Sequence, residues 1–133
     1  MVATSINKDN FTLIKETRES IPRVSFVEIK NEILGKKYAL NLIITTPARM
    51  KELNTIYRDK EHATDILSFP ISDTEGEMYI SLEETKKMAP KFDRSFENFF
   101  AFLFIHGCTH LKGHDHGAIM EGIESKIRRK FNV

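Results

Sequence analysis

The stretch His106-Gly107-Cys108-Thr109-His110-Leu111-Lys112-Gly113-His114-Asp115-His116 decides how this chain is interpreted, because three imidazoles recur in it as H-x-x-x-H-x-x-G-x-x-H. His106 and His110 are one helical turn apart, so their Cβ atoms would lie about 5–6 Å apart on one helix face. Gly113 can adopt the left-handed conformation that ends a helix, after which the chain can return His116 to the same ion. The pattern therefore predicts a metal site at the end of a helix, with these three histidines as ligands.

The same spacing is typical of metzincin proteases, in which a Glu directly after the first His is the general base. Here that position is Gly107. Three neutral imidazoles with a fourth position open are the ligand set of a catalytic zinc ion, because structural zinc is generally closed by four ligands. Zinc lowers the pKa of a bound water from about 15.7 to about 7, so water can be activated without the Glu. The motif thus favours catalysis, but not peptide hydrolysis by the metzincin route.

Length and composition limit the class of protein. A chain of 133 residues suits one domain, residues 1–133, that buries a core without disulfides. The 20 Lys and Arg against 19 Asp and Glu give a net charge of +1, so bulk charge neither requires nor excludes a nucleic-acid partner. The single cysteine, Cys108, and an N-terminus without a signal-peptide pattern predict a cytoplasmic protein. The longest apolar run, residues 99–105, is too short to span a membrane.

Hydrophobic periodicity predicts an α+β fold in which helices outnumber strands. Alternating apolar side chains predict four strands, at residues 11–17, 38–45, 66–69 and 78–80. The first would be an edge strand, the second a central strand, and the last two an antiparallel hairpin, with Pro70 closing the third. Helical spacing with start and stop signals predicts five helices, at residues 22–34, 47–58, 82–89, 95–110 and 118–131.

Two of these helices have features that bear on function. The helix that carries His106 and His110 is apolar on almost all sides, so it should be buried in the core. Cys108 on this helix would then be a small core residue and not a ligand. In the last helix, we expect Ile119, Ile123 and Ile127 to face the core, and Lys126, Arg128, Arg129 and Lys130 to be solvated.

Three segments together resemble the YbeY family of bacterial metal-dependent endoribonucleases. They are Leu53-Asn54-Thr55-Ile56-Tyr57-Arg58 with Thr64-Asp65-Ile66-Leu67-Ser68-Phe69-Pro70, then Gly76-Glu77-Met78, then the histidine stretch. The chain departs from the family pattern at Thr109 and His114, where Leu and Tyr are usual, and at Glu77-Met78, where Asp-Ile is common. All three metal positions match it.

The resemblance implies a mixed four-stranded sheet flanked by about five helices, with the metal site at the end of a buried helix. It also implies one zinc ion per chain on His106, His110 and His116, with another divalent transition metal as the alternative. The implied function is single-strand-specific cleavage in the maturation of the 3′ end of small-subunit ribosomal RNA, and ribosome quality control. The implied partners are the small ribosomal subunit and its assembly factors, and we favour a monomer.

Cleavage of an RNA phosphodiester needs stabilisation of developing negative charge. Arg58, whose planar fork matches two phosphate oxygens, is the candidate for this catalytic and RNA-binding role. The alternative for Arg58 is a structural ion pair with Asp59 or Asp65. Lys60 and Lys112 are candidates for binding the RNA backbone.

The proton acceptor is less clearly marked in the sequence. Asp115 is a candidate for orienting a ligand or accepting a proton, and His114 is a candidate acceptor through a water molecule. Two other functions remain open: a metal-dependent hydrolase of another bond, and a ribosome-assembly or RNA-binding factor whose metal is structural.

Overall fold

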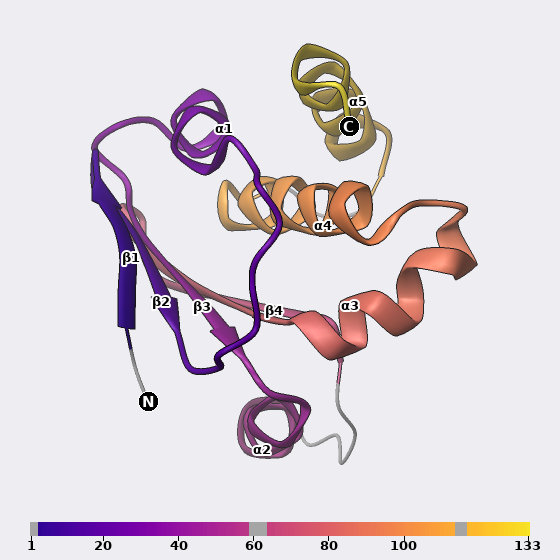
Figure 1. Ribbon diagram of the computed structural model, residues 1–133. Coiled ribbons are helices and arrows are strands. Elements are labelled where there is room, and N and C mark those ends of the chain that lie inside the picture. Colours follow the sequence, from indigo (N-terminus) through magenta and orange to yellow (C-terminus); the bar gives the residue numbers. More distant parts are fainter. Residues whose placement is uncertain (1–2, 59–63, 114–116) are drawn as a thin grey trace.

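The structure, a computed structural model, describes residues 3–58, 64–113 and 117–133 (Figure 1). Within these ranges, five strands form one mixed sheet in the order β1-β2-β3-β5-β4: β1 (Ala3–Lys8), β2 (Phe11–Lys15), β3 (Ala39–Thr45), β4 (Ile66–Ser72) and β5 (Glu75–Ser81). The helices are α1 (Phe26–Ile33), α2 (Pro47–Arg58), α3 (Leu82–Met88), the 3₁₀ helix η1 (Ala89–Phe92), α4 (Phe96–Leu111) and α5 (Ala118–Phe131). The α+β fold class is confirmed.

The sheet has one strand more than the four that the sequence predicted. The additional strand, β1, pairs antiparallel with β2, so that residues 11–15 lie inside the sheet and not at its edge. Asp9 and Asn10 join the two strands with positive φ angles of 51° and 62°. Asn and Asp tolerate this conformation in two-residue hairpin turns, whereas the segment before them has little apolar alternation to mark a strand.

Several predicted boundaries were also wrong, among them the start of β5, which is Glu75 and not Met78. β4 does not end before Pro70 but continues to Ser72, because β4 is an edge strand, where a missing N–H breaks no ladder between neighbours. α1 begins at Phe26, four residues after Pro22. Most other helix starts follow local signals: Thr46, Ser81 and Ser95 each accept a bond from the backbone N–H three residues later, as N-caps do.

The helices lie on both faces of the sheet (Figure 1). α1 and α4 cover one face, α5 lies on the far side of α4 from the sheet, and α2 lies against the other face. α4 is buried as predicted: Phe100 and Phe104 are fully inaccessible, and the Phe104 ring meets Phe26 of α1 edge-on at 5.1 Å and Phe11 of β2 at 5.9 Å. None of the described helices combines the length and the apolar composition that crossing a bilayer requires.

The predicted buried face of α5 is correct at Ile127, and Ile123 packs against the core, but the prediction was wrong for Ile119. Ile119 is 74% exposed, whereas Met120, Glu124 and Ile127 are almost fully buried. Arg128 was expected in solvent, but only 14% of its side chain is exposed. The cause is packing against α4, which selects the stripe through residues 120, 124 and 127.

Gly107 is where α4 comes closest to the sheet. A Cβ atom at this position would lie 2.5 Å from Met78 Cε and 2.9 Å from Ile66 Cδ1, both of which belong to sheet strands. Such distances are far inside van der Waals contact, and Met78 is fully buried. A side chain at Gly107 would therefore force the ends of the Met78 and Ile66 side chains to move, and the buried Met78 has little space in which to do so.

We expect the same substitution at two helical glycines to have opposite effects. Gly107→Ala should lower the free energy of unfolding, because overpacking costs about 1–3 kcal/mol and exceeds the helix-propensity gain of about 1 kcal/mol. Gly122→Ala in α5, where a Cβ would meet nothing within 4 Å, should raise stability by about 0.5–1 kcal/mol. Urea unfolding of both variants measures the difference, and a Gly107→Ala protein as stable as Gly122→Ala would contradict the close packing.

Candidate metal centre

Helix α4 places His106 and His110 one turn apart near its C-terminal end. The helix ends as predicted, with Gly113 in the left-handed region at φ 103° and its N–H bonded to the carbonyl of His110 at 3.0 Å. The chain turns out of the helix directly before the segment that contains His116. Two of the three predicted ligands are thus on adjacent turns of a rigid, buried helix.

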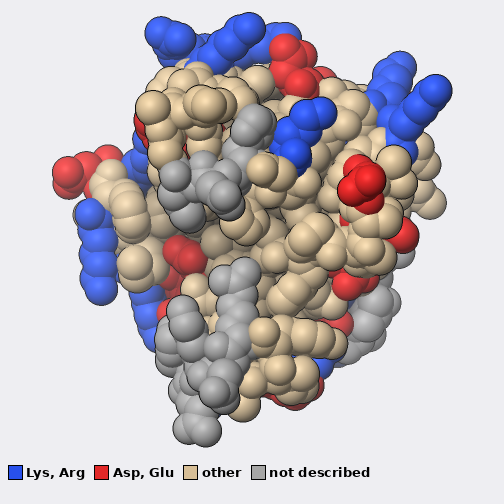
Figure 2. Space-filling model, turned by 180° about the vertical axis from the view of Figure 1, so that it is seen from behind, with Lys and Arg blue, Asp and Glu red and all other residues tan. Residues whose placement is uncertain are grey.

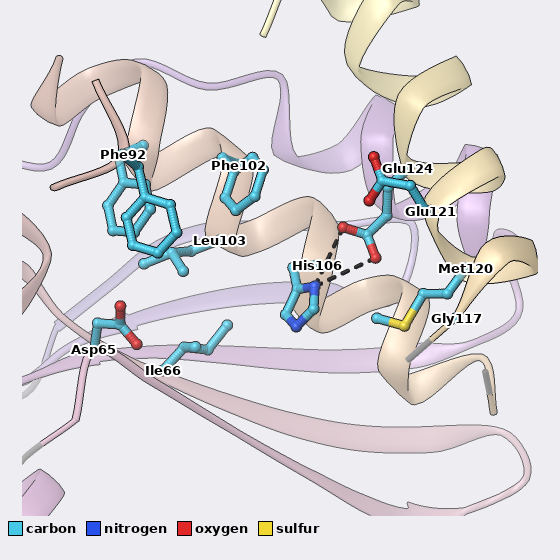
Figure 3. Close-up of a pocket in the computed structure, with 11 residues that line it drawn as sticks. Asp65, Ile66, Phe92, Phe102, Leu103, His106, Gly117, Met120, Glu121 and Glu124 are labelled. Atoms are coloured by element: carbon cyan, nitrogen blue, oxygen red, sulfur yellow. Dashed lines mark hydrogen bonds and ion pairs between the residues drawn. The ribbon is translucent and has the colours of Figure 1, made fainter. Parts of the chain in front are cut away.

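The His106 ring is oriented by a carboxylate from another helix (Figure 3). Nδ1 of His106 lies 3.2 Å and 3.3 Å from the two carboxylate oxygens of Glu124 on α5, and the other ring nitrogen points away from Glu124. When Nδ1–H donates to this carboxylate, Nε2 is left as the lone-pair nitrogen. Metal-binding histidines generally have this second partner, which fixes the tautomer and makes the ligand more basic. His106 is therefore prepared to bind a cation.

Glu124 is itself held by a charge network on α5. Its side chain is 4% exposed, and Nη1 of Arg128 lies 3.7 Å from its Oε1. Arg128 also donates to Oε1 of Glu121 at 2.9 Å, which lowers the pKa of that carboxyl group. A buried carboxylate is costly unless it is paired, and here it has a guanidinium on one side and an imidazole on the other.

Sequence reasoning missed Glu124 and the burial of Arg128. One signal was available, since Glu124 is a charged residue between Met120 and Ile127, at positions that share a face with them. An acid on the apolar stripe of an amphipathic helix indicates a buried partner. The partner itself, His106, is 18 residues away and on another helix.

The structure describes only some of the remaining predicted site residues. Lys112 is exposed at the end of α4, and Arg58 is the last residue of α2, although its side chain is outside the described part. Four of the predicted residues lie outside the described residues altogether: Lys60, His114, Asp115 and His116. Within residues 3–58, 64–113 and 117–133, no three His, Cys, Asp or Glu side chains form a metal-binding group. The triad with His116 stays a prediction.

Two other positions in the histidine motif face away from the site. Gly107 points at Met78 and Ile66 of the sheet, so the residue that replaces the metzincin Glu has neither the space nor the direction to act on a metal. Cys108 is fully buried, and burial raises the pKa of its thiol. A thiolate ligand is disfavoured there, in agreement with its prediction as a core residue.

A cavity of about 330 Å³ opens beside His106 (Figure 3). Its apolar wall consists of side chains from β4, η1, α4 and α5: Ile66, Phe92, Phe99, Phe102, Leu103 and Met120. Three carboxylates, those of Asp65, Glu121 and Glu124, also border it. The candidate ligand His106 is therefore in the wall of a cleft large enough for part of a substrate.

On the face of the molecule opposite that of Figure 1, charged side chains are dispersed (Figure 2). Lys and Arg side chains lie mainly around the periphery, and mostly uncharged residues occupy the centre. No continuous basic patch covers the described residues on this face. Binding of a polyanion would therefore depend on local cations and not on the net charge of +1.

Comparison with known proteins gives one family. A family model described as Endoribonuclease YbeY matches residues 4–132, which is nearly the whole chain. The histidine motif, α2 and the β4–β5 hairpin all lie inside the matched region.

Individual relatives agree with the family match. The chain is 38% identical to "Endoribonuclease YbeY" of Nautilia profundicola over 101 residues, which cover 71% of this chain and 73% of the relative. It is 38% identical to the protein of the same name from Petrotoga mobilis over 106 residues, covering 77% and 71%. Among solved structures, the solution structure of TM1509 from Thermotoga maritima is similar, with a TM-score of 0.59, 28% identity, and 80% and 81% of the two chains covered.

Glu124→Gln should weaken binding of zinc at the predicted metal site without unfolding the protein. The amide keeps the size of the side chain but removes the charge that orients His106, so we expect the dissociation constant for zinc to rise about 10- to 100-fold. Competition with a chromogenic chelator measures this constant. Glu121→Gln is the matched comparison, because Glu121 is on the same helix and bonds to Arg128, and its electrostatic interaction with His106 is the smallest of the causes that lower its pKa. Equal zinc affinities in the two variants would contradict the role of Glu124.

Proposed function

This chain belongs to the YbeY endoribonuclease family, and from that premise we propose that it is a metal-dependent endoribonuclease. The observation that carries the proposal is the bond between Nδ1 of His106 and Glu124, beside an open cavity. It supports a metal ligand in the orientation that hydrolytic sites use, within the motif that the family match covers.

The residues that would hold the metal are His106, His110 and His116. All three donors are imidazoles, a set that suits zinc and other divalent transition metals. When bound, zinc would supply a Lewis acid that polarises a phosphate oxygen and lowers the pKa of water. We propose one zinc ion per chain.

The chain's own residues have separate tasks in this proposal. Glu124 holds the His106 ring so that the Nε2 lone pair is directed away from α5. The Arg58 guanidinium would bind two phosphate oxygens and stabilise the charge that develops as the P–O bond breaks. Lys112, exposed at the end of α4, would bind a neighbouring phosphate, as would Lys60. Asp115 and His114 are the proposed proton acceptors.

We extend the proposal to the biological substrate as the family resemblance implies it. The RNA would be single-stranded, at the 3′ end of the small-subunit ribosomal RNA, and the partners would be the small subunit and its assembly factors in the cytoplasm. The protein would act as a monomer.

The competing functions are less well supported. Peptide hydrolysis by the metzincin route needs a carboxylate after the first His, and the space at Gly107 is filled by Met78 and Ile66. A purely structural metal is disfavoured because a cavity adjoins His106, whereas structural zinc sites are closed by protein ligands. Cleavage of RNA with and without a chelator separates an enzyme from an assembly factor.

His106→Ala and His110→Ala should each abolish zinc binding and RNA cleavage while the protein stays folded, because a two-ligand site binds zinc weakly. Elemental analysis and cleavage of precursor ribosomal RNA measure the two effects, and circular dichroism checks the fold. His62→Ala, a histidine outside the motif, is the control and should behave like the wild type. Full activity in either metal-free variant would remove the metal from the mechanism.

Arg58→Lys should bind zinc normally yet cleave RNA about 10- to 100-fold more slowly, because an ammonium cannot form the two parallel bonds of a guanidinium. Arg49→Lys is the matched control, since Arg49 is on the same helix and pairs with the exposed Glu52. The comparison uses kcat for a single-stranded RNA. Unchanged turnover of the Arg58 variant would assign Arg58 to a structural ion pair instead.

A further inference from the structure

The cavity beside His106 has a chemical character that phosphate binding does not explain. Three carboxylates border it, and none of its described lining residues is Lys or Arg. Anionic walls repel phosphate at short range. The part of a substrate that enters this cavity is therefore not a phosphate group, and a base, which carries no charge, meets no such repulsion.

Aromatic rings form one wall of the cavity. Phe92 stacks on Phe99 with ring centroids 4.9 Å apart and planes 22° apart, and Phe99 in turn lies parallel to Phe102 at 5.8 Å. The centroids of Phe92 and Phe102 are 6.3 Å apart, so the three rings form a triangular cluster, in which Phe92 is 49% exposed. Its ring presents a flat apolar surface to a planar ligand.

The face of the Phe102 ring, in the same cluster, is covered by two cations. The Arg94 guanidinium lies 4.4 Å from its centroid and the Arg128 guanidinium 5.3 Å from it. These cations pack on the ring but do not border the cavity. Phe92 is therefore the ring whose exposed surface is available to contact a ligand.

Asp65 provides a hydrogen-bond acceptor on the opposite side (Figure 3). It directly precedes β4 and borders the cavity together with Ile66. Its carboxyl group is partly buried, and this burial raises its pKa despite bonds from backbone N–H groups. A carboxylate that has lost part of its hydration gains from a ligand N–H donor.

We propose that this cavity accepts one unstacked nucleobase of a single-stranded RNA, with Phe92 stacking on the base and Asp65 accepting from its amino group. The volume of about 330 Å³ suits a single base and not a duplex, which agrees with single-strand specificity. Uracil lacks an exocyclic amino group, so bases that carry one are preferred. This inference rests on the proposed function, because it takes the ligand to be the RNA that the neighbouring metal centre cleaves.

The test pairs changes in the protein with changes in the RNA. A series of fluorescent single-stranded oligonucleotides carries one abasic residue each, at successive positions across the cleavage region. Equilibrium binding and cleavage of each oligonucleotide by the zinc-loaded protein are measured. At one position, the wild type should lose roughly tenfold or more in affinity when the base is removed. In Phe92→Ala, removing the base at that position should lower the affinity little further. The loss of affinity caused by the substitution and the loss caused by the abasic residue are then not additive.

Two further variants keep the test decisive. Phe92→Tyr retains the ring, so removing the base should again lower the affinity as it does for the wild type. Ile71→Ala changes an exposed apolar residue on β4 outside the cavity and should leave that loss of affinity unchanged. At the same position, the wild type should favour cytosine over uracil by about tenfold, and Asp65→Asn should abolish most of this preference. Thermal melting checks that each variant is folded.

The outcomes separate the two proposals. If the losses of affinity caused by Phe92→Ala and by the abasic residue are additive at every position, the nucleobase site is overturned, whether or not the RNA is cleaved. A wild-type protein that binds with the expected coupling but cleaves no RNA overturns the proposed function and leaves the nucleobase site standing.

Discussion

The close contact between α4 and the sheet at Gly107 is the constraint on which the site depends. Because the ends of the Met78 and Ile66 side chains occupy the space where a Cβ atom would be, the glycine lets α4 lie close to the sheet with this face turned toward it. That rotation buries Phe100 and Phe104 in the core. It also leaves His106, which is half-buried, directed at α5 and the cavity and not at the sheet. Packing of the core and orientation of the candidate ligand are thus decided together.

Helix α5, packed on α4, provides the groups that orient the candidate ligand His106. α5 contributes no predicted metal ligand, but its Glu124 sets the His106 ring and its Arg128 offsets the buried charge of Glu124. A histidine on a rigid helix still has freedom about its side-chain torsions, and a carboxylate bond removes much of it. The site is therefore built by two helices, of which only one carries the recognisable motif.

The cavity and the cations suggest that base and backbone are recognised in different places. The lining of carboxylates and aromatic rings suits a neutral planar group, while the cations proposed for phosphate binding come from the end of α2, the end of α4 and the segment after α2. In this proposal the phosphates are bound outside the cavity, because Asp65 and Glu121 would repel them. This division also explains how a chain with a net charge of +1 and no continuous basic patch on the described residues of one face could act on RNA.

The sequence by itself determined what local interactions control. The starts of α2, α3 and α4 follow from Thr46, Ser81 and Ser95, the end of α4 from Gly113, and the neighbouring positions of His106 and His110 from the pitch of a helix. These signals depend on residues within one or two turns of each other.

Only the tertiary structure decided which surfaces meet. β1 was missed because its strand character comes from pairing with β2 and not from its own pattern. In α5, Ile119 was wrongly expected in the core, because packing against α4 buries Met120 and Glu124 instead. Glu124, Asp65 and Phe92 likewise reach the site from segments remote in sequence. Their roles arise from packing between distant elements, and no spacing along a single chain records such contacts.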